Sequence, residues 1–499
     1  MNRFYDNSAT RRFSFPSVMH AAAFVCALLN IVLSPWCFGS WEMWWFWPMA
    51  ALLFAGCLFA GIGTLLEAIM IDDRDDTPRS DRPPLAWSAI IAAVAFVPFL
   101  VYALVRAHFP SAPGLPLVAM ETERSLLLFF TPAALALIMA LSFTRRRLAV
   151  AAWIVFANIT IIAIYAIVGT LAGYVDYVLW VESPWTYGGR AKAVFFCPNH
   201  LSAYMNLGIC LALALVFAPR TGWRVKVVAV LAAFAMAWAD FLTLSRGGLA
   251  SLLLGLAIGL PILAMRGRQL WARLLAPILL AASLAGAVFA IWHIPNPLME
   301  RVSAHPLYKS VAENWGAPEL KTRIHDSFWY SFDRGTYIQS ALRAWKSNPV
   351  WGIGPGQHSN RWQEFNPTDP GVPPVDGDPA TMKRPRYVNY TQHLYEVHSD
   401  WTQLLEEYGV VGFVLFAIPI LILFVVLCFA QSSMNADAPR PAGVSSPAIL
   451  RALPLAALLA FIVMSIHSLG DFSFQMPSIT WLFTFLAAGG VLSATRSDE

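Results

Sequence analysis

The chain has 499 residues, of which 58% are hydrophobic and only 13% are charged. A soluble chain usually carries about twice that charged fraction, so the composition argues against a water-soluble globular protein. The net charge of +4 is too small to indicate a nucleic-acid partner, and no basic run or nucleic-acid-binding motif is present. The 20 Trp and 33 Phe are typical of lipid-facing helices and of the aromatic belts at membrane surfaces.

Apolar runs long enough to cross the ~30 Å hydrocarbon core of a bilayer recur along the chain. The expected spans are 18–38, 44–70, 85–106, 123–143, 148–173, 194–218, 227–244, 248–265, 274–294, 405–430, 452–470 and 478–495. The sequence therefore predicts an all-α polytopic membrane protein with about twelve transmembrane helices. Nine of them lie in 18–294 and three in 405–495, with short termini at 1–17 and 496–499.

The distribution of Lys and Arg predicts the orientation of these spans. Eighteen of the 34 lie in segments that the alternation assigns to one side of the membrane, and five lie in the short loops on the other side. The remaining eleven lie in one long loop, which is too long to count toward orientation. By the positive-inside rule, both termini face the cytoplasm and the long loop lies outside.

The long loop, 295–404, lies before the tenth span and gathers titratable side chains. It holds five of the ten histidines, and eleven Asp or Glu beside its eleven Lys or Arg. Alternating aromatic and polar residues over 327–345 predict an amphipathic helix along the membrane surface. Residues 366–385, rich in Pro, Gly and Asp, predict irregular structure. We expect the chemistry of the protein in this loop.

Cysteine usage and motif content predict neither disulfides nor a metal cofactor. The six cysteines lie in or beside apolar runs, and none falls in the long loop. No CxxC pair, HExxH motif or zinc-like spacing is present. The run Gly352-x-Gly354-x-Gly356 looks like a nucleotide loop, but no strand precedes it, so turn formation is the better interpretation.

Four segments, in chain order, carry a family resemblance. They are the Phe195–Tyr204 segment FFCPNHLSAY, the Leu244–Leu249 segment LSRGGL, the Arg334–Gly356 segment with its Trp, Pro and Gly residues, and the His398–Gly409 segment HSDWTQLLEEYG. Together they resemble the O-antigen ligase/polymerase family of bacterial membrane glycosyltransferases. This family includes O-antigen ligases, exopolysaccharide polymerases and O-oligosaccharyltransferases. The resemblance covers roughly residues 190–475, and the Gly470–Gln475 turn is similar to that of polymerase members.

The resemblance implies a GT-C-like fold and a metal-independent inverting glycosyltransferase without a cofactor. Such an enzyme takes a glycan from undecaprenyl diphosphate at the periplasmic face of the bacterial inner membrane. It passes the glycan to an acceptor hydroxyl on another glycan or on lipid A core, in cell-surface polysaccharide assembly. The partners implied are this donor, the acceptor, membrane lipid and other polysaccharide-assembly proteins.

Three residues match the catalytic positions of that family. A lipid diphosphate leaving group requires cations, and the bidentate fork of Arg suits phosphate oxygens. The acceptor hydroxyl requires a general base, a role that His fills at neutral pH without further tuning. By resemblance, Arg246 and Arg334 bind the diphosphate and His398 is the base. The alternatives are an interfacial anchor, a solvated charge and a packed histidine, respectively.

Five further residues complete the candidate site. The substrate-binding candidates are Asn199, His200, Arg190, Arg343 and Asp400. Helix initiation after Pro198 explains Asn199 and His200 equally well, and an ordinary interfacial anchor explains Arg190. Arg343 takes the role of Arg334 if the register in which this segment matches the family is wrong. Either Asp400 or Glu406 can orient the His398 imidazole, and spacing does not choose between them.

Several functions fit these observations. A ligase, a polymerase and a protein oligosaccharyltransferase differ only in their acceptor, with a slight preference for polymer assembly from the last outer turn. The rival from another class is a twelve-span secondary transporter or a polysaccharide exporter without transferase activity. Carriers often place their long loop between two related halves, whereas here it follows the ninth span.

Overall fold

The computed structural model describes residues 14–71, 93–109, 118–185, 187–264, 285, 300, 302–322, 333–365, 396–435 and 447–495. Helices dominate these residues. They are α1 (Phe15–Leu33), α2 (Met43–Ile71), α4 (Val97–His108), α5 (Ala119–Ser142), α6 (Arg145–Leu171), α7 (Pro198–Phe217), α8 (Trp223–Leu242), α9 (Arg246–Ala264), α12 (Pro306–Glu313), α14 (Asp333–Ser347), α15 (His358–Arg361), α16 (Asp400–Asn435), α17 (Ala448–His467) and α18 (Pro477–Thr495).

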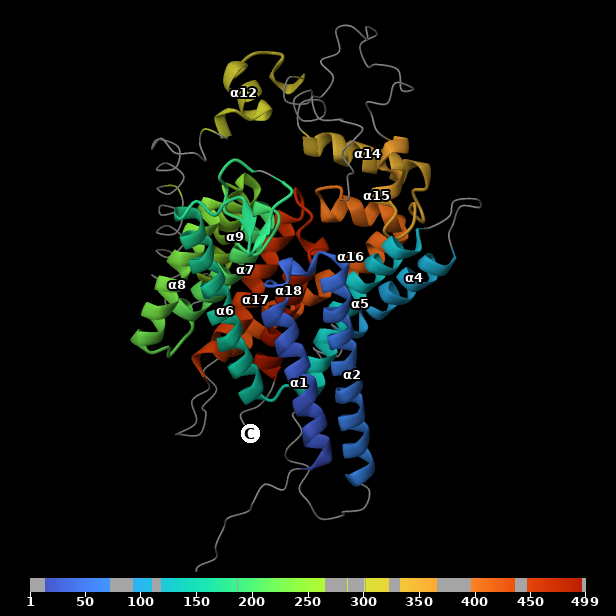
Figure 1. The fold of residues 1–499 in the computed structure, drawn as a ribbon, viewed down its shortest axis with the longest axis vertical. Coiled ribbons are helices and arrows are strands. Elements are labelled where there is room, and N and C mark those ends of the chain that lie inside the picture. The colour runs from blue at the N-terminus through green and yellow to red at the C-terminus, as the bar shows by residue number, and fades with distance from the viewer. Residues whose placement is uncertain are drawn as a thin grey trace, which may run out of the picture.

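Short elements complete the described chain. The 3-10 helices are η1 (Phe38–Ser40), η2 (Trp362–Phe365) and η3 (Ser473–Gln475), and β1 (Tyr177–Val178) pairs antiparallel with β2 (Val181–Glu182). In Figure 1, α12, α14 and α15 lie at one end of the bundle, while α1 and α2 reach toward the other end. The described part of the long loop therefore forms a cap over one end of the helices.

The protein is an all-α multi-pass membrane protein, as predicted. Among the described residues, nine helices are long and apolar enough to cross a membrane, and two shorter apolar helices accompany them at Ala93–His108 and Arg246–Gly259. These eleven helices coincide with eleven of the twelve expected spans. The ninth expected span, apart from residue 285, lies outside the described residues, as does 366–385. The predicted amphipathic helix corresponds to α14, although 327–332 are also outside them. The sidedness stays a prediction.

Burial separates central helices from peripheral ones. Over an 18-residue stretch, 83% of α7, 72% of α17 and 78% of α18 is buried, against 28% of α8 and 17% of α16. In a membrane protein the exposed apolar faces of the peripheral helices meet lipid, while the central helices meet only protein. The outer ends of α7, α17 and α18 are therefore rigidly placed, and these ends carry the polar residues described below.

Small residues let α9 approach the central helices closely. A Cβ on Gly248 would lie 1.8 Å from Ser202 Oγ of α7, and one on Gly255 would lie 2.9 Å from the Cα of Val463 in α17. Asn206 Nδ2 also donates to the carbonyl oxygen of Gly248 at 3.0 Å. Small residues at helix crossings are the usual way for membrane helices to pack backbone against backbone. This packing fixes the position of the first turn of α9.

The glycine run of the long loop is a turn that packs on α16, as predicted. The backbone N–H groups of Ile353 and Gly354 donate to carbonyl oxygens of α16 at 2.9 and 3.0 Å. Gly352 and Gly409 both have positive φ, +73° and +65°, and their backbones touch. Arg106 supports the turn by donating through Nη2 to the carbonyl oxygen of Gly352 at 3.3 Å. The cap is thereby attached to the start of α16.

Candidate active site

The turn that joins α17 to α18 places a buried carboxylate among cationic side chains. Asp471 is only 1% exposed. Its Oδ1 accepts a hydrogen bond from the backbone N–H of Phe472 at 2.9 Å, and its Oδ2 accepts one from Arg334 Nη2 at 3.0 Å. Arg334, in the first turn of α14, also donates through Nη1 to the carbonyl oxygen of Gly470. One guanidinium therefore joins the cap to this turn at two points, as its forked donors allow.

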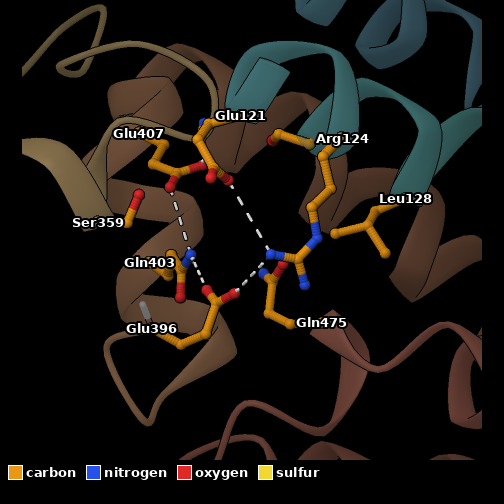
Figure 2. Close-up of a pocket in the computed structure, with 10 residues that line it drawn as sticks. Glu121, Arg124, Leu128, Ser359, Glu396, Gln403, Glu407 and Gln475 are labelled. Atoms are coloured by element: carbon orange, nitrogen blue, oxygen red, sulfur yellow. Dashed lines mark hydrogen bonds and ion pairs between the residues drawn. The ribbon is translucent and has the colours of Figure 1, made fainter. Parts of the chain in front are cut away.

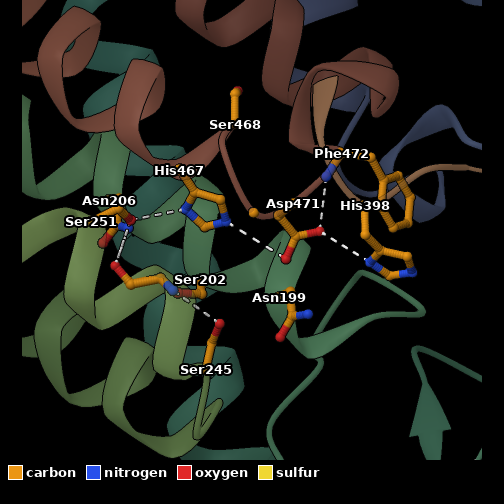
Figure 3. Close-up of polar contacts among 12 residues, drawn as sticks. Asn199, Ser202, Asn206, Ser245, Ser251, His398, His467, Ser468, Asp471 and Phe472 are labelled. Atoms are coloured by element: carbon orange, nitrogen blue, oxygen red, sulfur yellow. Dashed lines mark hydrogen bonds and ion pairs between the residues drawn. The ribbon is translucent and has the colours of Figure 1, made fainter. Parts of the chain in front are cut away.

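Two imidazoles approach the same carboxylate from different sides (Figure 3). His398 Nδ1 lies 3.8 Å from Asp471 Oδ1, and His467 Nε2 lies 3.8 Å from Asp471 Oδ2. The other ring nitrogen of His467 lies 3.1 Å from Ser251 Oγ, which donates to the carbonyl oxygen of Gly248 at 2.8 Å. A polar chain thus runs from α9 through the end of α17 to the candidate base.

The charges of this centre follow from burial and from the neighbouring groups. Burial alone would raise the pKa of Asp471, but the charge of Arg334 and the interactions with His398 and His467 outweigh it and hold that pKa well below its usual value. Burial lowers the pKa of His398; Asp471 opposes this effect and Arg334 adds to it. At neutral pH the carboxylate is therefore ionised and the His398 imidazole is neutral.

The backbone and the neighbouring rings fix the orientation of His398. Its φ is +60°, in the left-handed region that few residues other than glycine adopt and that His adopts more readily than most. Phe472 contacts the ring edge to face, with centroids 4.6 Å apart, and the Tyr337 ring lies at 5.4 Å. Ser399 then begins α16 by accepting from the N–H of Thr402 at 3.3 Å. About a quarter of the His398 side chain, 26%, stays exposed, so a substrate can reach it.

Arg246 lies beside Arg334 at the start of α9. A Cβ on Gly247 would lie 3.6 Å from Arg334 Nη1, so this guanidinium covers the bare backbone next to Arg246. Burial, together with the nearby charges of Arg246 and Arg334, lowers the pKa of His305 to about 4. These three side chains therefore share one region. The N-terminus of α9 adds the positive end of its helix dipole there.

The candidates Arg190, Asn199 and His200 come from the segment before α7 and from the first turn of that helix. Arg190 donates through Nε to the carbonyl oxygen of Thr243 at 2.6 Å and through Nη2 to Asn199 Oδ1 at 2.8 Å. These bonds tie the segment before α7 to the end of α8. His200 is 3% exposed, and its ring packs edge to face on Phe472 with centroids 4.8 Å apart. Phe472 thus touches both His200 and the candidate base.

Neither carboxylate that the sequence suggested faces the candidate base. Asp400 Oδ2 accepts hydrogen bonds from Ser468 Oγ at 2.8 Å and from the backbone N–H of Phe474 at 3.1 Å, which holds the α17–α18 turn. Glu406 is fully buried, and its Oε2 lies 2.8 Å from His358 Nδ1. The prediction was wrong because both carboxylates are engaged elsewhere, Asp400 with the α17–α18 turn and Glu406 with His358. The carboxylate that faces the base comes from another turn.

Arg343 lies away from the centre. It follows Arg334 by nine residues on α14, which places it on about the opposite face of the helix and roughly 13 Å along its axis. Sequence reasoning missed the pairing of Asp471 with the base, and it missed His467 entirely. The available signals were the Gly470–Asp471 pair in the last outer turn and a histidine four residues before that Asp, at the end of an apolar helix.

This geometry supports two chemical tasks. A neutral imidazole backed by an ionised carboxylate can accept a proton from a hydroxyl group. Two guanidiniums at a helix N-terminus can hold an anion such as a phosphate. Within the part of the chain that the structure describes, no three His, Cys, Asp or Glu side chains form a metal-binding group.

A family model described as O-Antigen ligase matches residues 231–417. The matched range contains Arg246, Arg334 and His398, whereas Asp471 lies beyond its end. No curated protein matches the chain.

Proposed function

We propose that this member of the O-antigen ligase/polymerase family transfers a glycan from undecaprenyl diphosphate to an acceptor hydroxyl, as a polymerase or ligase in cell-surface polysaccharide assembly. The observation that carries the proposal is the convergence of Arg334, His398 and Asp471 beside the first turn of α9. The centre would lie at the periplasmic face of the inner membrane, with both termini in the cytoplasm, as the distribution of Lys and Arg predicts.

Arg246 and Arg334 would bind the diphosphate of the donor. The bond between the anomeric carbon and the diphosphate oxygen breaks during transfer, and its electron pair leaves with undecaprenyl diphosphate. Negative charge therefore grows on that oxygen, and fixed guanidiniums stabilise it more in the transition state than in the ground state. The side chain of Arg334 is 22% exposed, which leaves part of its donor edge open to a ligand.

His398 would remove the proton of the acceptor hydroxyl. With Nδ1–H directed toward Asp471, Nε2 carries the lone pair that takes this proton. The acceptor oxygen then attacks the anomeric carbon on the side opposite the leaving diphosphate, so a single displacement inverts the configuration. Asp471 stabilises the imidazolium that results, because an ionised carboxylate at that distance favours the charged ring. The two arginines supply the positive charge that a metal supplies in other transferases.

Single replacements test the proposal. Arg246→Ala, Arg334→Ala and His398→Ala should each abolish the polymer or glycoconjugate in cells, with lipid-diphosphate-linked glycan accumulating outside the cytoplasm. Arg343→Ala, on the far face of α14, is the matched control and should leave the glycans unchanged. Membrane expression is checked for every variant by immunoblot.

The remaining outcomes separate the rival functions. Unchanged glycans together with lost solute uptake in the three variants would favour a transporter and end the proposal. Single repeat units on lipid A core would identify a lost polymerase, whereas long chains without attachment would identify a lost ligase. Accessibility labelling that places 295–404 in the cytoplasm would also refute the proposed site.

A further inference from the structure

A second polar pocket lies at the same end of the bundle, between α5, α16 and the cap (Figure 2). It is lined by Glu121, Arg124, Ser125, Leu128, Gly356, Ser359, Glu396, Gln403, Glu407 and Gln475. The pocket has room for about one or two groups of the size of a water molecule. Its walls are mostly carboxylate, amide and hydroxyl groups, unlike the arginine-rich surface near the start of α9.

Two buried donors in this pocket lack a hydrogen-bond partner among the residues that the structure describes. Arg124 is 8% exposed, and its guanidinium lies over the Trp41 ring at 3.9 Å. Its Nη1 lies 3.8 Å from Glu396 Oε1, whereas its Nη2 has no hydrogen-bond partner among the described residues. Ser359 is 5% exposed, and its Oγ also lacks a partner within the same described residues. Because buried polar groups are nearly always hydrogen-bonded, these two donors indicate a polar ligand in the pocket.

The pocket adjoins the candidate active site through its walls. Glu396 comes two residues before His398, and Gln475 comes four residues after Asp471. Gln403 Nε2 donates to Glu396 Oε2, and Gln403 Oε1 accepts from the backbone N–H that directly precedes His398, at 3.2 Å. The segment that carries the candidate base is therefore one wall of the pocket.

The pocket and the arginine region near the candidate base differ in charge. Arg246, Arg334 and the N-terminus of α9 make up the arginine region, which suits a diphosphate. The pocket has three acidic side chains, Glu121, Glu396 and Glu407, against one guanidinium, so it lacks the excess of cationic donors that a phosphate requires. Carboxylate and amide acceptors combined with a buried guanidinium donor match a neutral, hydroxyl-bearing group, which both donates and accepts.

We propose that this pocket binds a hydroxyl or hydroxymethyl group of the acceptor sugar and so presents the neighbouring acceptor hydroxyl to His398. The inference rests on the proposed function and adds a location for the acceptor to it. The donor diphosphate lies on the arginine side and the acceptor on the carboxylate side, with the imidazole between them. Ordered water alone is the competing occupant, and the test separates the two.

The test uses full-length protein in lipid nanodiscs and two probes. Binding of undecaprenyl diphosphate reports the donor side alone. Transfer is measured against increasing amounts of lipid-linked glycan and lipid A core extracted from a host strain that lacks this protein. Gln475→Ala and Ser359→Ala each remove one polar group from the pocket without touching its ion pairs. Gln339→Ala, on α14 and outside the pocket lining, is the matched control.

The expected result is an effect on KM. Each pocket variant should reduce transfer about three- to tenfold at low extract and recover most of the rate at saturating extract, since each loses about one hydrogen bond to the acceptor. The affinity of each pocket variant for undecaprenyl diphosphate should stay unchanged. In the Gln339→Ala control, both the transfer rate and this affinity should stay unchanged. Unchanged transfer in both pocket variants is the result expected of a water-filled pocket, and it would overturn the acceptor site. A loss of undecaprenyl diphosphate affinity as large as the loss of transfer would also overturn it. Wild-type protein that neither binds undecaprenyl diphosphate nor transfers glycan would instead refute the proposed function.

Discussion

Replacing Asp471 by Asn tests whether the carboxylate acts through the imidazole. The two side chains have nearly the same shape, so Asp471→Asn removes the charge and keeps the volume. Arg334 then loses its ion pair at 3.0 Å, and His398 loses the carboxylate that lies 3.8 Å from Nδ1. The imidazole keeps its ring contacts but has no partner to stabilise its charged form during proton transfer.

The structure bounds the size of the effect. A positioned general base contributes about 10²- to 10⁴-fold to a rate, and a group that only orients the base contributes no more than this. Because Asp471 approaches His398 at ion-pair distance and not at hydrogen-bond distance, we expect about a 10- to 10³-fold loss of transfer rate, or roughly 1.4 to 4 kcal/mol. Folding should suffer less than the ~3–5 kcal/mol typical of a broken buried pair, since Arg334 is 22% exposed and water can solvate it.

The assay is a double-mutant cycle on transfer from lipid-linked glycan, with protein in nanodiscs. If Asp471 acts through the base, Asp471→Asn should have little further effect in the His398→Ala background. Asp176→Asn, at an exposed position before the β1–β2 hairpin, is the matched control and should retain the full rate. Losses that multiply in the double variant would refute the reasoning, because they would show that the two residues act independently.

Three further predictions follow from the same contacts. Arg334→Gln removes a charge that lowers the pKa of His398. The acid limb of the pH–rate profile, which is expected below about pH 6.5 in the wild type, should therefore move to higher pH, and a shift to lower pH would contradict this. Gly409→Ala should reduce the yield of folded protein in size-exclusion chromatography, because its Cβ would lie 2.3 Å from the carbonyl oxygen of Val350 at a positive φ, whereas Gly61→Ala meets open space and should not. Transfer in the presence of EDTA should proceed at the untreated rate, because arginines supply the positive charge; a loss that Mg²⁺ restores would contradict this.

The helical bundle could be predicted because each span is a local property of the sequence. Hydropathy over about twenty residues marks a helix wherever it packs, and eleven expected spans coincide with described helices. The ends of the helices were predicted less accurately than their positions. The sixth span was expected from residue 194, but α7 begins at Pro198, since proline at the first position of a helix starts it without losing a backbone hydrogen bond.

The composition of the candidate site was less predictable because its contacts join distant parts of the chain. Arg334 and Asp471 are 137 residues apart, and no local periodicity relates them. Hydropathy placed Asp471 in an outer turn but not beside the base. The sequence therefore suggested Asp400 and Glu406, which follow His398 closely in the chain. Both are used by the fold, one for the α17–α18 turn and one for the buried pair with His358.

The α17–α18 turn explains why the donor and acceptor sides can be so close and yet differ in charge. Asp471 pairs with Arg334, and Gln475, four residues later, lines the polar pocket. The 3-10 helix η3 and the hydrogen bonds that Asp400 accepts from Ser468 and Phe474 hold this segment in place. Under the proposed mechanism, a few residues of this buried turn set the distance between the diphosphate and the acceptor. Changes of the acceptor sugar should accordingly be met by changes at Gln475 or Ser359, while Asp471 stays fixed because it pairs with Arg334 and faces the proposed base.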